Sequence, residues 1–126
     1  MLKFLQKHEF EPDKFLLMDA RDTHWYEQMT IPTPVNIPYS DIQDDEDLNN
    51  EYTRALDLLN IKKDKDGKLD FSLAKEVIVF CNSNWCVQSV WGIKSLVNMG
   101  YPKNKIFWYR GGLQDWITSG FITVTP

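Results

Sequence analysis

The sequence predicts an α/β fold in which helices flank a central, mostly parallel sheet. Short apolar runs typical of buried strands alternate with apolar-periodic segments typical of helices, and glycines or prolines separate many of them. The chain has 126 residues, of which 43% are hydrophobic, so it is long enough to bury a proper core. We therefore expect residues 1–126 to form a single domain.

The first half of the chain predicts strands that alternate with short helices. Residues 15–18 form an apolar run that we expect to be a strand ending at Asp19. Three prolines exclude a helix from residues 31–38. The other expected elements are a helix over 21–28, a brief strand over 35–37, a helical turn over 39–42 and a helix from Asp44 to about Asn60, whose acidic first turn suits the helix dipole.

The second half contains the predicted central strand at residues 77–80, where three of the four side chains are β-branched. Before this strand, Asp66-Gly67 predicts a tight turn. The elements expected after it are a helix over 88–99 that ends at Gly100, a strand over 106–109, a helix over 113–119 and a last short strand over 121–124.

The charge of the chain argues against some kinds of partner. The net charge is −4 and the sequence pI is near 5.1, which disfavours binding to nucleic acid or to an anionic membrane surface. Its apolar runs are too short for a membrane segment. The first residues lack the apolar core of a signal peptide, so we expect a cytoplasmic protein. A periplasmic location would follow if an export signal had been removed.

Two cysteines and two histidines limit the chemistry that the chain can perform. Two cysteines are too few for a disulfide scaffold, and no cysteine–histidine cluster has the spacing of a zinc site, so we expect no metal. A catalytic pair of Cys81 with His24 is one interpretation. The alternative, an exposed histidine on the first helix, is the one that we favour.

Cys81 is the strongest candidate for a nucleophile. It follows the predicted central strand and precedes a small polar stretch and a helix. A thiol in this position meets the free N–H groups of a loop and of a helix N-terminus, which stabilise the thiolate. Because ligands of α/β folds bind beyond the carboxyl ends of parallel strands, we also note Asp19 and Arg110, which stand at or next to two other strand ends.

The residues after Cys81 can hold an anionic sulfur with neutral donors. No lysine or arginine lies between Cys81 and Lys94, so Arg110 is the nearest strand-end cation, although a surface salt bridge is an equally good interpretation of it. The segment that we assign to the active-site loop comprises Asn82, Ser83, Asn84, Trp85, Val87, Gln88 and Ser89, in addition to the two cysteines.

Cys86 and the tryptophans allow more than one interpretation. Cys86 is a resolving thiol for Cys81, a partly buried small residue, or a second site for sulfur relay. Trp85 is either a lid that faces the substrate or a packed anchor. Trp91, Trp108 and Trp116 fall within regular elements, and we expect them in the core.

Taken together, motifs spread over nearly the whole chain resemble the rhodanese family. Asp19-Ala20-Arg21 is similar to the Asp-x-Arg sequence after the first strand of that family, and residues 77–81 resemble the strand that delivers its catalytic cysteine. The other matching motifs are Ile31-Pro32, the segment from Val35 to Pro38, Gly100-Tyr101, and Gly111-Gly112 followed by Trp116. The resemblance implies a three-layer rhodanese-like fold in which Asp19 and Arg21 are structural strand-end residues.

The chain departs from the family pattern around two of these motifs. Met29-Thr30 stands where Gly-His is usual, and the loop has Asn84 for a usual glycine and Cys86 for a usual arginine. If Ser89 closes the loop, the loop is two residues longer than usual. This variant resembles a subgroup with a second cysteine beside a tryptophan, several of whose members are exported and bacterial.

The resemblance implies a sulfurtransferase in which Cys81 carries sulfane sulfur as a persulfide. Its partners would be a small-molecule or protein persulfide, or thiosulfate, as the donor and a thiol or cyanide as the acceptor, and no cofactor would be needed. Two other functions remain open from the residues: a thiol–disulfide redox protein that uses Cys81 and Cys86, and a binding module of the same fold without catalysis. A phosphatase-type loop is disfavoured because Cys86 stands where a closing arginine is required.

Overall fold

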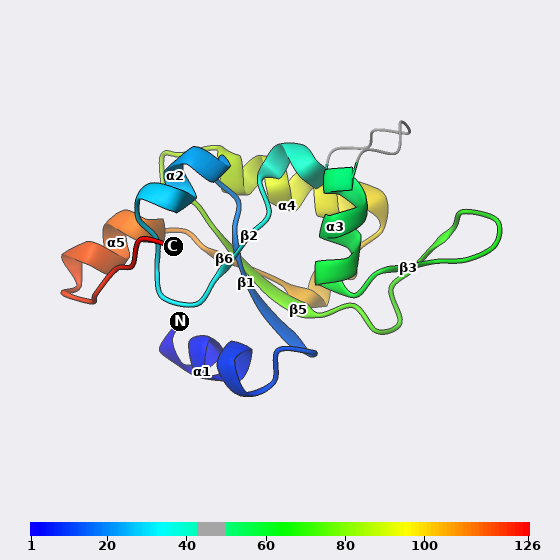
Figure 1. The fold of residues 1–126 in the computed structure, drawn as a ribbon, viewed down its shortest axis with the longest axis horizontal. Helices are drawn as coiled ribbons and strands as arrows, with labels where there is room; N and C mark the ends of the chain where they lie inside the picture. Colours follow the sequence, from blue (N-terminus) through cyan, green and yellow to red (C-terminus); the bar gives the residue numbers. More distant parts are fainter. Residues whose placement is uncertain (43–49) are drawn as a thin grey trace.

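The computed structural model describes residues 1–42 and 50–126, and it confirms the predicted α/β fold (Figure 1). Four strands form a wholly parallel sheet in the order β2-β1-β5-β6. They are β1 (Phe15–Asp19), β2 (Val35–Asn36), β5 (Glu76–Phe80) and β6 (Ile106–Tyr109). A separate antiparallel pair, β3 (Lys62–Lys63) and β4 (Leu69–Asp70), forms a hairpin.

Helices lie on both sides of the sheet, and most of their bounds follow the sequence pattern. The α-helices are α1 (Leu2–Phe10), α2 (Thr23–Gln28), α3 (Asn50–Leu59), α4 (Gln88–Met99) and α5 (Gly112–Thr118), and the 3₁₀ helices are η1 (Tyr39–Ile42) and η2 (Lys103–Lys105). The predicted start of α3 at Asp44 lies outside the described residues. None of the described helices is long and apolar enough to cross a membrane.

Alternating side chains of the central strands build a separate core on each face of the sheet. Leu16 and Met18 of β1 point to the face that α3 and α4 cover. Leu17, between them, points to the opposite face and packs with Phe80 and with residues of α1 and α5. Figure 1 shows α3 and α4 on one side of the sheet and α1 on the other, so the protein has three layers.

Helix α1 is an element that the sequence analysis did not predict. Its only buried residue is His8, whose Nδ1 accepts a hydrogen bond from the N–H of Leu17 at 3.1 Å. The other ring nitrogen therefore carries the proton and donates to the carbonyl of Thr33 at 2.7 Å. Long-range contacts of this kind attach α1 to the sheet, and a local apolar pattern does not reveal them.

The predicted Asp-Gly turn is confirmed as the tip of the β3–β4 hairpin. Gly67 has a φ of 80°, a conformation that favours glycine. The carboxylate of Asp64 accepts hydrogen bonds from the N–H groups of Asp66 and Lys68 at 2.9 and 2.8 Å. The aspartates here therefore order a turn.

Two predictions about the second half of the chain are wrong. Residues 121–124 do not form a strand. Of these residues, only Val124 makes a bridge, to Thr30, and Thr30 belongs to none of the strands that the structure describes, so the pairing does not extend into a ladder. Trp91 and Trp108 are 44% and 41% exposed, because Trp91 packs against the Tyr39 ring at the surface and Trp108 lies on the edge strand β6, whereas Trp116 is buried as predicted.

Candidate active site

Cys81 lies directly after β5, at the centre of the carboxyl edge of the sheet. In the sheet, Phe80 pairs with Asp19 on one side and with Tyr109 on the other. Cys81, the next residue, is therefore flanked by the residues that follow Asp19 and Tyr109. Cys81 is 1% exposed, so its sulfur lies in a largely dry environment. The strand end thus brings Cys81 close to Asp19 and Arg110, as the parallel arrangement predicts.

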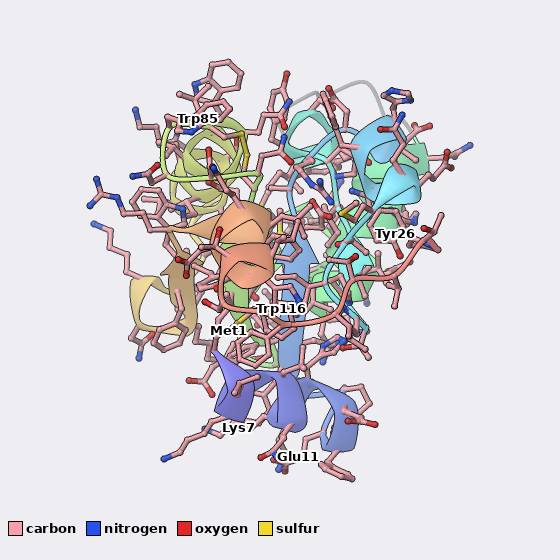
Figure 2. All side chains as sticks on the ribbon, turned by 90° about the vertical axis from the view of Figure 1, so that its left-hand side faces the viewer. Met1, Lys7, Glu11, Tyr26, Trp85 and Trp116 are labelled. Carbon is pink, nitrogen blue, oxygen red and sulfur yellow. A yellow bond between two sulfur atoms is a disulfide. The ribbon has the colours of Figure 1, made fainter. Side chains whose placement is uncertain are left out.

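Residues 81–87 fold back on themselves and join the two cysteines. The N–H of Cys86 donates to the carbonyl of Ser83 at 3.2 Å, which closes a tight turn. Cys81 and Cys86 form a disulfide, with their Cα atoms 6.3 Å apart. Cys86 itself is half-buried, whereas Trp85 beside it is 74% exposed and projects from the surface (Figure 2).

The start of α5 holds the first two peptide groups of the loop. The N–H groups of Leu113 and Gln114 donate to the carbonyls of Cys81 and Asn82 at 2.9 and 2.7 Å. Gly112 allows this close approach: its φ is 62°, and a side chain there would collide with the carbonyl group of Cys81. The Gly-Gly motif therefore has a steric role in shaping the loop.

This contact also sets the direction of the N–H groups of the loop. In a planar trans peptide the N–H points opposite to the carbonyl, so the N–H groups of Asn82 and Ser83 point away from α5. Among the described residues, none accepts a hydrogen bond from the N–H of Asn82, Ser83, Asn84 or Trp85. The loop therefore has free donors of the kind that stabilise an anionic sulfur.

A buried ion pair connects the end of β1 to the loop. Arg21 and Asp19 are 1% and 0% exposed, and the guanidinium forms paired hydrogen bonds with the carboxylate, the shortest of them 2.7 Å. The Nη1 of Arg21 also donates to the side-chain carbonyl of Asn82 at 2.9 Å. The two residues implied to be structural thus bring a cation into contact with the residue next to Cys81.

Thr30 and Asn36 support this ion pair, and the sequence analysis assigned neither of them a role. The hydroxyl of Thr30 donates to the Asp19 carboxylate at 2.9 Å. The side-chain amide of Asn36 donates to the carbonyls of Asp19 and Arg21 at 3.1 and 2.9 Å. The departure from the usual family histidine at the position of Thr30 was the available signal for this residue.

Gln88 and Asp22 lie on the sulfur side of the loop. The side-chain oxygen of Gln88 is 4.0 Å from the sulfur of each cysteine, and its nitrogen donates to the Asp22 carboxylate at 3.4 Å. Ser89 is buried, and its hydroxyl accepts a hydrogen bond from the indole of Trp108 at 3.0 Å. Exposed Val87 precedes α4, so Gln88 and Ser89 already belong to its first turn.

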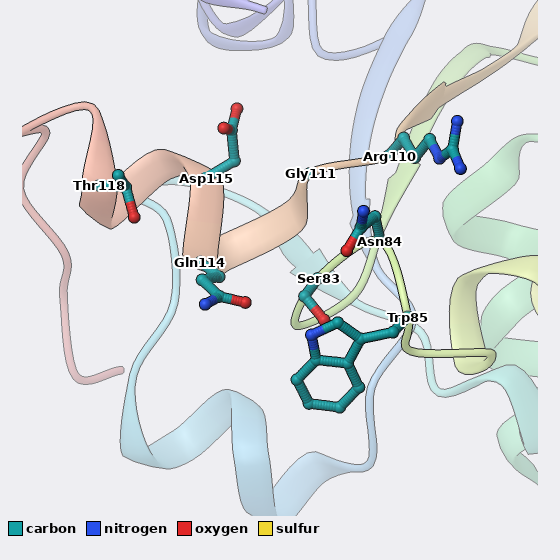
Figure 3. A pocket seen from close by; sticks show the side chains of 8 residues that line it. All are labelled: Ser83, Asn84, Trp85, Arg110, Gly111, Gln114, Asp115 and Thr118. Atoms are coloured by element: carbon teal, nitrogen blue, oxygen red, sulfur yellow. The ribbon is translucent and has the colours of Figure 1, made fainter.

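A pocket of about 650 Å³ lies between the loop and α5 (Figure 3), and neither cysteine lines it. Its lining includes Ser83, Asn84, Trp85, Arg110, Gln114 and Asp115. The hydroxyl of Ser83 is buried without a hydrogen-bond partner among the described residues. The guanidinium of Arg110 lies over the Trp108 ring, 5.7 Å from its centroid, and it points away from the pocket.

Asp115 at this pocket is held by a neighbouring tyrosine. The Tyr109 hydroxyl donates to the Asp115 carboxylate at 3.1 Å. Burial, together with this hydrogen bond and the charge of Asp115, raises the pKa of Tyr109 to about 12. Tyr109 therefore remains a neutral donor over the whole physiological pH range.

The other candidates from the sequence lie away from the cysteines. His24 is exposed on α2, and its ring contacts Gln28 at 3.1 Å, in line with the favoured interpretation of an exposed histidine. Among the described residues, no group of three histidine, cysteine or acidic side chains is arranged to hold a metal ion.

A family model described as "Rhodanese-like domain" matches residues 3–119. No curated protein matches the sequence. The similar solved structures include a protein of Bacillus halodurans, BH2092, with a TM-score of 0.63 and 20% identity over 98% of this chain and 71% of that one. A structure described as rhodanese with anions, from E. coli, has a TM-score of 0.56 and 21% identity over 89% of this chain and 99% of that one.

A third similar structure is a thiosulfate sulfurtransferase from Pseudomonas aeruginosa. It has a TM-score of 0.60 and 21% identity over 95% of this chain, but the match covers only 18% of that protein. At these identities the three structures establish only a shared fold. The match to the family model establishes to which family the chain is assigned.

Proposed function

Because the chain belongs to the rhodanese-like domain family, we propose that it is a sulfurtransferase in which Cys81 carries sulfane sulfur as a persulfide. The observation that carries this proposal is the environment of Cys81. Its sulfur is buried at a parallel strand end, in a loop where the carbonyls of Cys81 and Asn82 accept hydrogen bonds from α5, so that the N–H groups of Asn82 and Ser83 point the other way.

In the first half of the proposed reaction, the Cys81 thiolate attacks the outer sulfur of the donor. With a persulfide donor, RS–SH, the S–S bond breaks and the donor leaves as RS⁻, while Cys81 becomes Cys81–S–SH. With thiosulfate, sulfite leaves instead. Free N–H groups of the loop, including those of residues 82–85, can stabilise an ionised persulfide, because these donors are already fixed in place.

In the second half, an acceptor thiolate attacks the outer sulfur of the Cys81 persulfide. The new persulfide leaves on the acceptor, and Cys81 returns as a thiolate. No redox cofactor is needed because the sulfane sulfur is transferred between thiols without net oxidation of the protein.

The Cys81–Cys86 disulfide supports a resolving role for Cys86, as a second fate of the Cys81 persulfide in place of transfer to the acceptor. The Cys86 thiolate would attack the inner sulfur of the persulfide, release hydrosulfide and leave the disulfide. An external dithiol would then have to reduce that disulfide before the next turnover. This step explains a second cysteine in the loop without replacing the sulfur-carrying role of Cys81.

Mass spectrometry of the intact protein tests the proposed function. The protein is reduced, freed of reductant, and incubated with thiosulfate or with a low-molecular-weight persulfide. We expect the mass to rise by one sulfur atom and peptide mapping to locate that atom on Cys81. Because Cys86 can convert the persulfide into the disulfide, a loss of two hydrogen atoms is interpreted with Cys86→Ser: this variant retains an added sulfur atom if Cys81 carries sulfur, and gains none if the protein is only a thiol–disulfide redox protein. A protein that does not react at all would be a binding module.

A further inference from the structure

We propose that the Asp22 carboxylate, acting through the side chain of Gln88, makes the sulfur site select against anionic substrates, so that it prefers thiols that are neutral or carry an ammonium group. This inference rests on the proposed function, because it takes Cys81 as the reacting sulfur. It assigns a specificity-determining role to a residue outside the loop that carries the cysteines.

Asp22 stands at the N-cap position of α2 but does not cap it. An aspartate there usually accepts a hydrogen bond from an N–H of the first turn, and no such bond is present. Its carboxylate instead accepts the hydrogen bond from Gln88, 66 residues away in the sequence. Among the described residues, no cation lies within ion-pair distance of Asp22, so its negative charge is not compensated directly.

The ionised carboxylate fixes which way the Gln88 amide faces. A carboxylate can only accept, so the NH₂ of Gln88 turns toward Asp22 at 3.4 Å and the carbonyl oxygen turns toward the sulfurs at 4.0 Å. The oxygen offers an anionic sulfur no donor. To donate to the sulfur, Gln88 would have to present its oxygen to the carboxylate, and two acceptors repel each other.

Neither of the two arginines at this edge of the sheet forms an ion pair with Asp22 among the described residues. Arg21 is buried in its ion pair with Asp19, so the pair contributes no net charge. Arg110 lies over Trp108, 5.7 Å from the ring centroid, and it forms no ion pair with Asp22 in the part of the chain that the structure describes. The sulfur side of the loop therefore carries the negative charge of Asp22 and a carbonyl oxygen, and both disfavour an approaching anion.

The consequence is a preference for certain substrate classes. Thiosulfate is a dianion, and thiols with carboxylate tails add a negative charge beside Asp22. A thiol with an ammonium tail would instead form a favourable interaction with the same carboxylate. For one unit charge near a protein surface at low ionic strength, we expect rate differences of roughly three- to tenfold.

Two thiol reagents of opposite charge test this inference on the reduced full-length chain with Cys86→Ser, the parent protein of this experiment, in which no second thiol can displace the label from Cys81. Aminoethyl methanethiosulfonate is cationic and sulfonatoethyl methanethiosulfonate is anionic. In both cases the Cys81 thiolate attacks the reagent sulfur, forms a mixed disulfide and releases methanesulfinate. The rate of modification of Cys81 is followed by peptide mapping and divided by the rate at which the same reagent modifies free 2-mercaptoethanol. The ratio of the two normalised rates, cationic over anionic, is the charge preference of the site.

We expect the parent protein to prefer the cationic reagent, and Asp22→Asn to reduce that preference by roughly three- to tenfold at low salt. Asparagine is also a good N-cap residue, so this variant preserves the start of α2. The matched control is Asp66→Asn, which removes the same charge from the exposed tip of the hairpin. It should leave the preference unchanged.

An unchanged preference in Asp22→Asn, or an equal change in Asp66→Asn, would overturn the inference. The measurement depends only on the reactivity of a thiol. A protein that fails to load sulfur would therefore disprove the proposed function and still report on Asp22.

Discussion

At the scale of single residues, Arg21 links the cysteine loop to the end of β1. Its guanidinium donates to Asp19, to the carbonyl of Met29 and to Asn82. A buried ion pair adds little net stability compared with a well-packed apolar pair, but removal of one partner leaves an uncompensated buried charge. The geometry of the loop thus depends on a pair that tolerates little change.

We expect Arg21→Met to lower the free energy of unfolding by about 3–5 kcal/mol, because Asp19 would remain buried without its partner. Urea denaturation at neutral pH measures this loss. The matched control, Asn82→Ala, removes only the contact to the loop and should cost about 1–2 kcal/mol while it slows sulfur loading. Equal stability of the two variants would show that the ion pair is not the main effect.

The sequence identified several of these residues but not how they are connected. Cys81 follows from its position after a β-branched run, and Asp19 and Arg21 follow from a motif. The bond from Arg21 to Asn82 joins residues 61 positions apart, and no local pattern encodes it. For this reason Arg110 was expected to be the main positive charge, whereas Arg21 is the arginine that hydrogen-bonds to the loop. The role of Arg110 in anion binding stays a prediction.

At the scale of elements, the contact between the loop and α5 explains the structural role of the Gly-Gly motif. Gly112 lets the start of α5 come close enough for two of its N–H groups to donate to the carbonyls of Cys81 and Asn82. This contact fixes the first two peptides of the loop. The shape of the sulfur site therefore depends on an element more than thirty residues beyond the cysteine.

We expect Gly112→Ala to destabilise the protein by about 3 kcal/mol or more, since it adds backbone overlap to an unfavourable φ. Gly120→Ala is the matched control: its φ is also positive, at 87°, but nothing lies within 4 Å of the added carbon, so about 1–2 kcal/mol should be lost. Thermal unfolding of both variants, followed by sulfur loading of the folded protein, measures the difference. Similar losses in the two variants would mean that the contact with Cys81 is not tight.

Elements with local signals were predicted well, and those that depend on partners were not. Helix α4 has its predicted bounds because its periodic apolar pattern and Gly100 at its end, with a φ of 103°, are both local. Helix α1 is held by His8, which bonds to β1 and to Thr33 in the loop before β2, and residues 121–124 pair with no strand that the structure describes. The burial of Trp91 and Trp108 was predicted wrongly for the same reason: a position within a helix or strand does not determine which face of that element is covered.

At the scale of the whole molecule, the parallel sheet is what brings the site together. Strands β1, β5 and β6 all end at one edge, so Asp19, Cys81 and Arg110 come from three distant parts of the sequence to one surface. Cores on both faces hold the strands in register. The alternation of strands and helices in the sequence was enough to predict this arrangement, whereas the side-chain network across the edge required the structure.

The central claim is that Cys81 carries the sulfur and Cys86 only resolves it. The most direct measurement is the amount of sulfur bound after reduced protein is incubated with a low-molecular-weight persulfide, determined by intact mass for Cys81→Ser and Cys86→Ser. We predict that Cys86→Ser retains one added sulfur atom for longer than the parent protein, because no second thiol removes it, and that Cys81→Ser retains none. Stable sulfur loading of Cys81→Ser, with none on Cys86→Ser, would contradict the account.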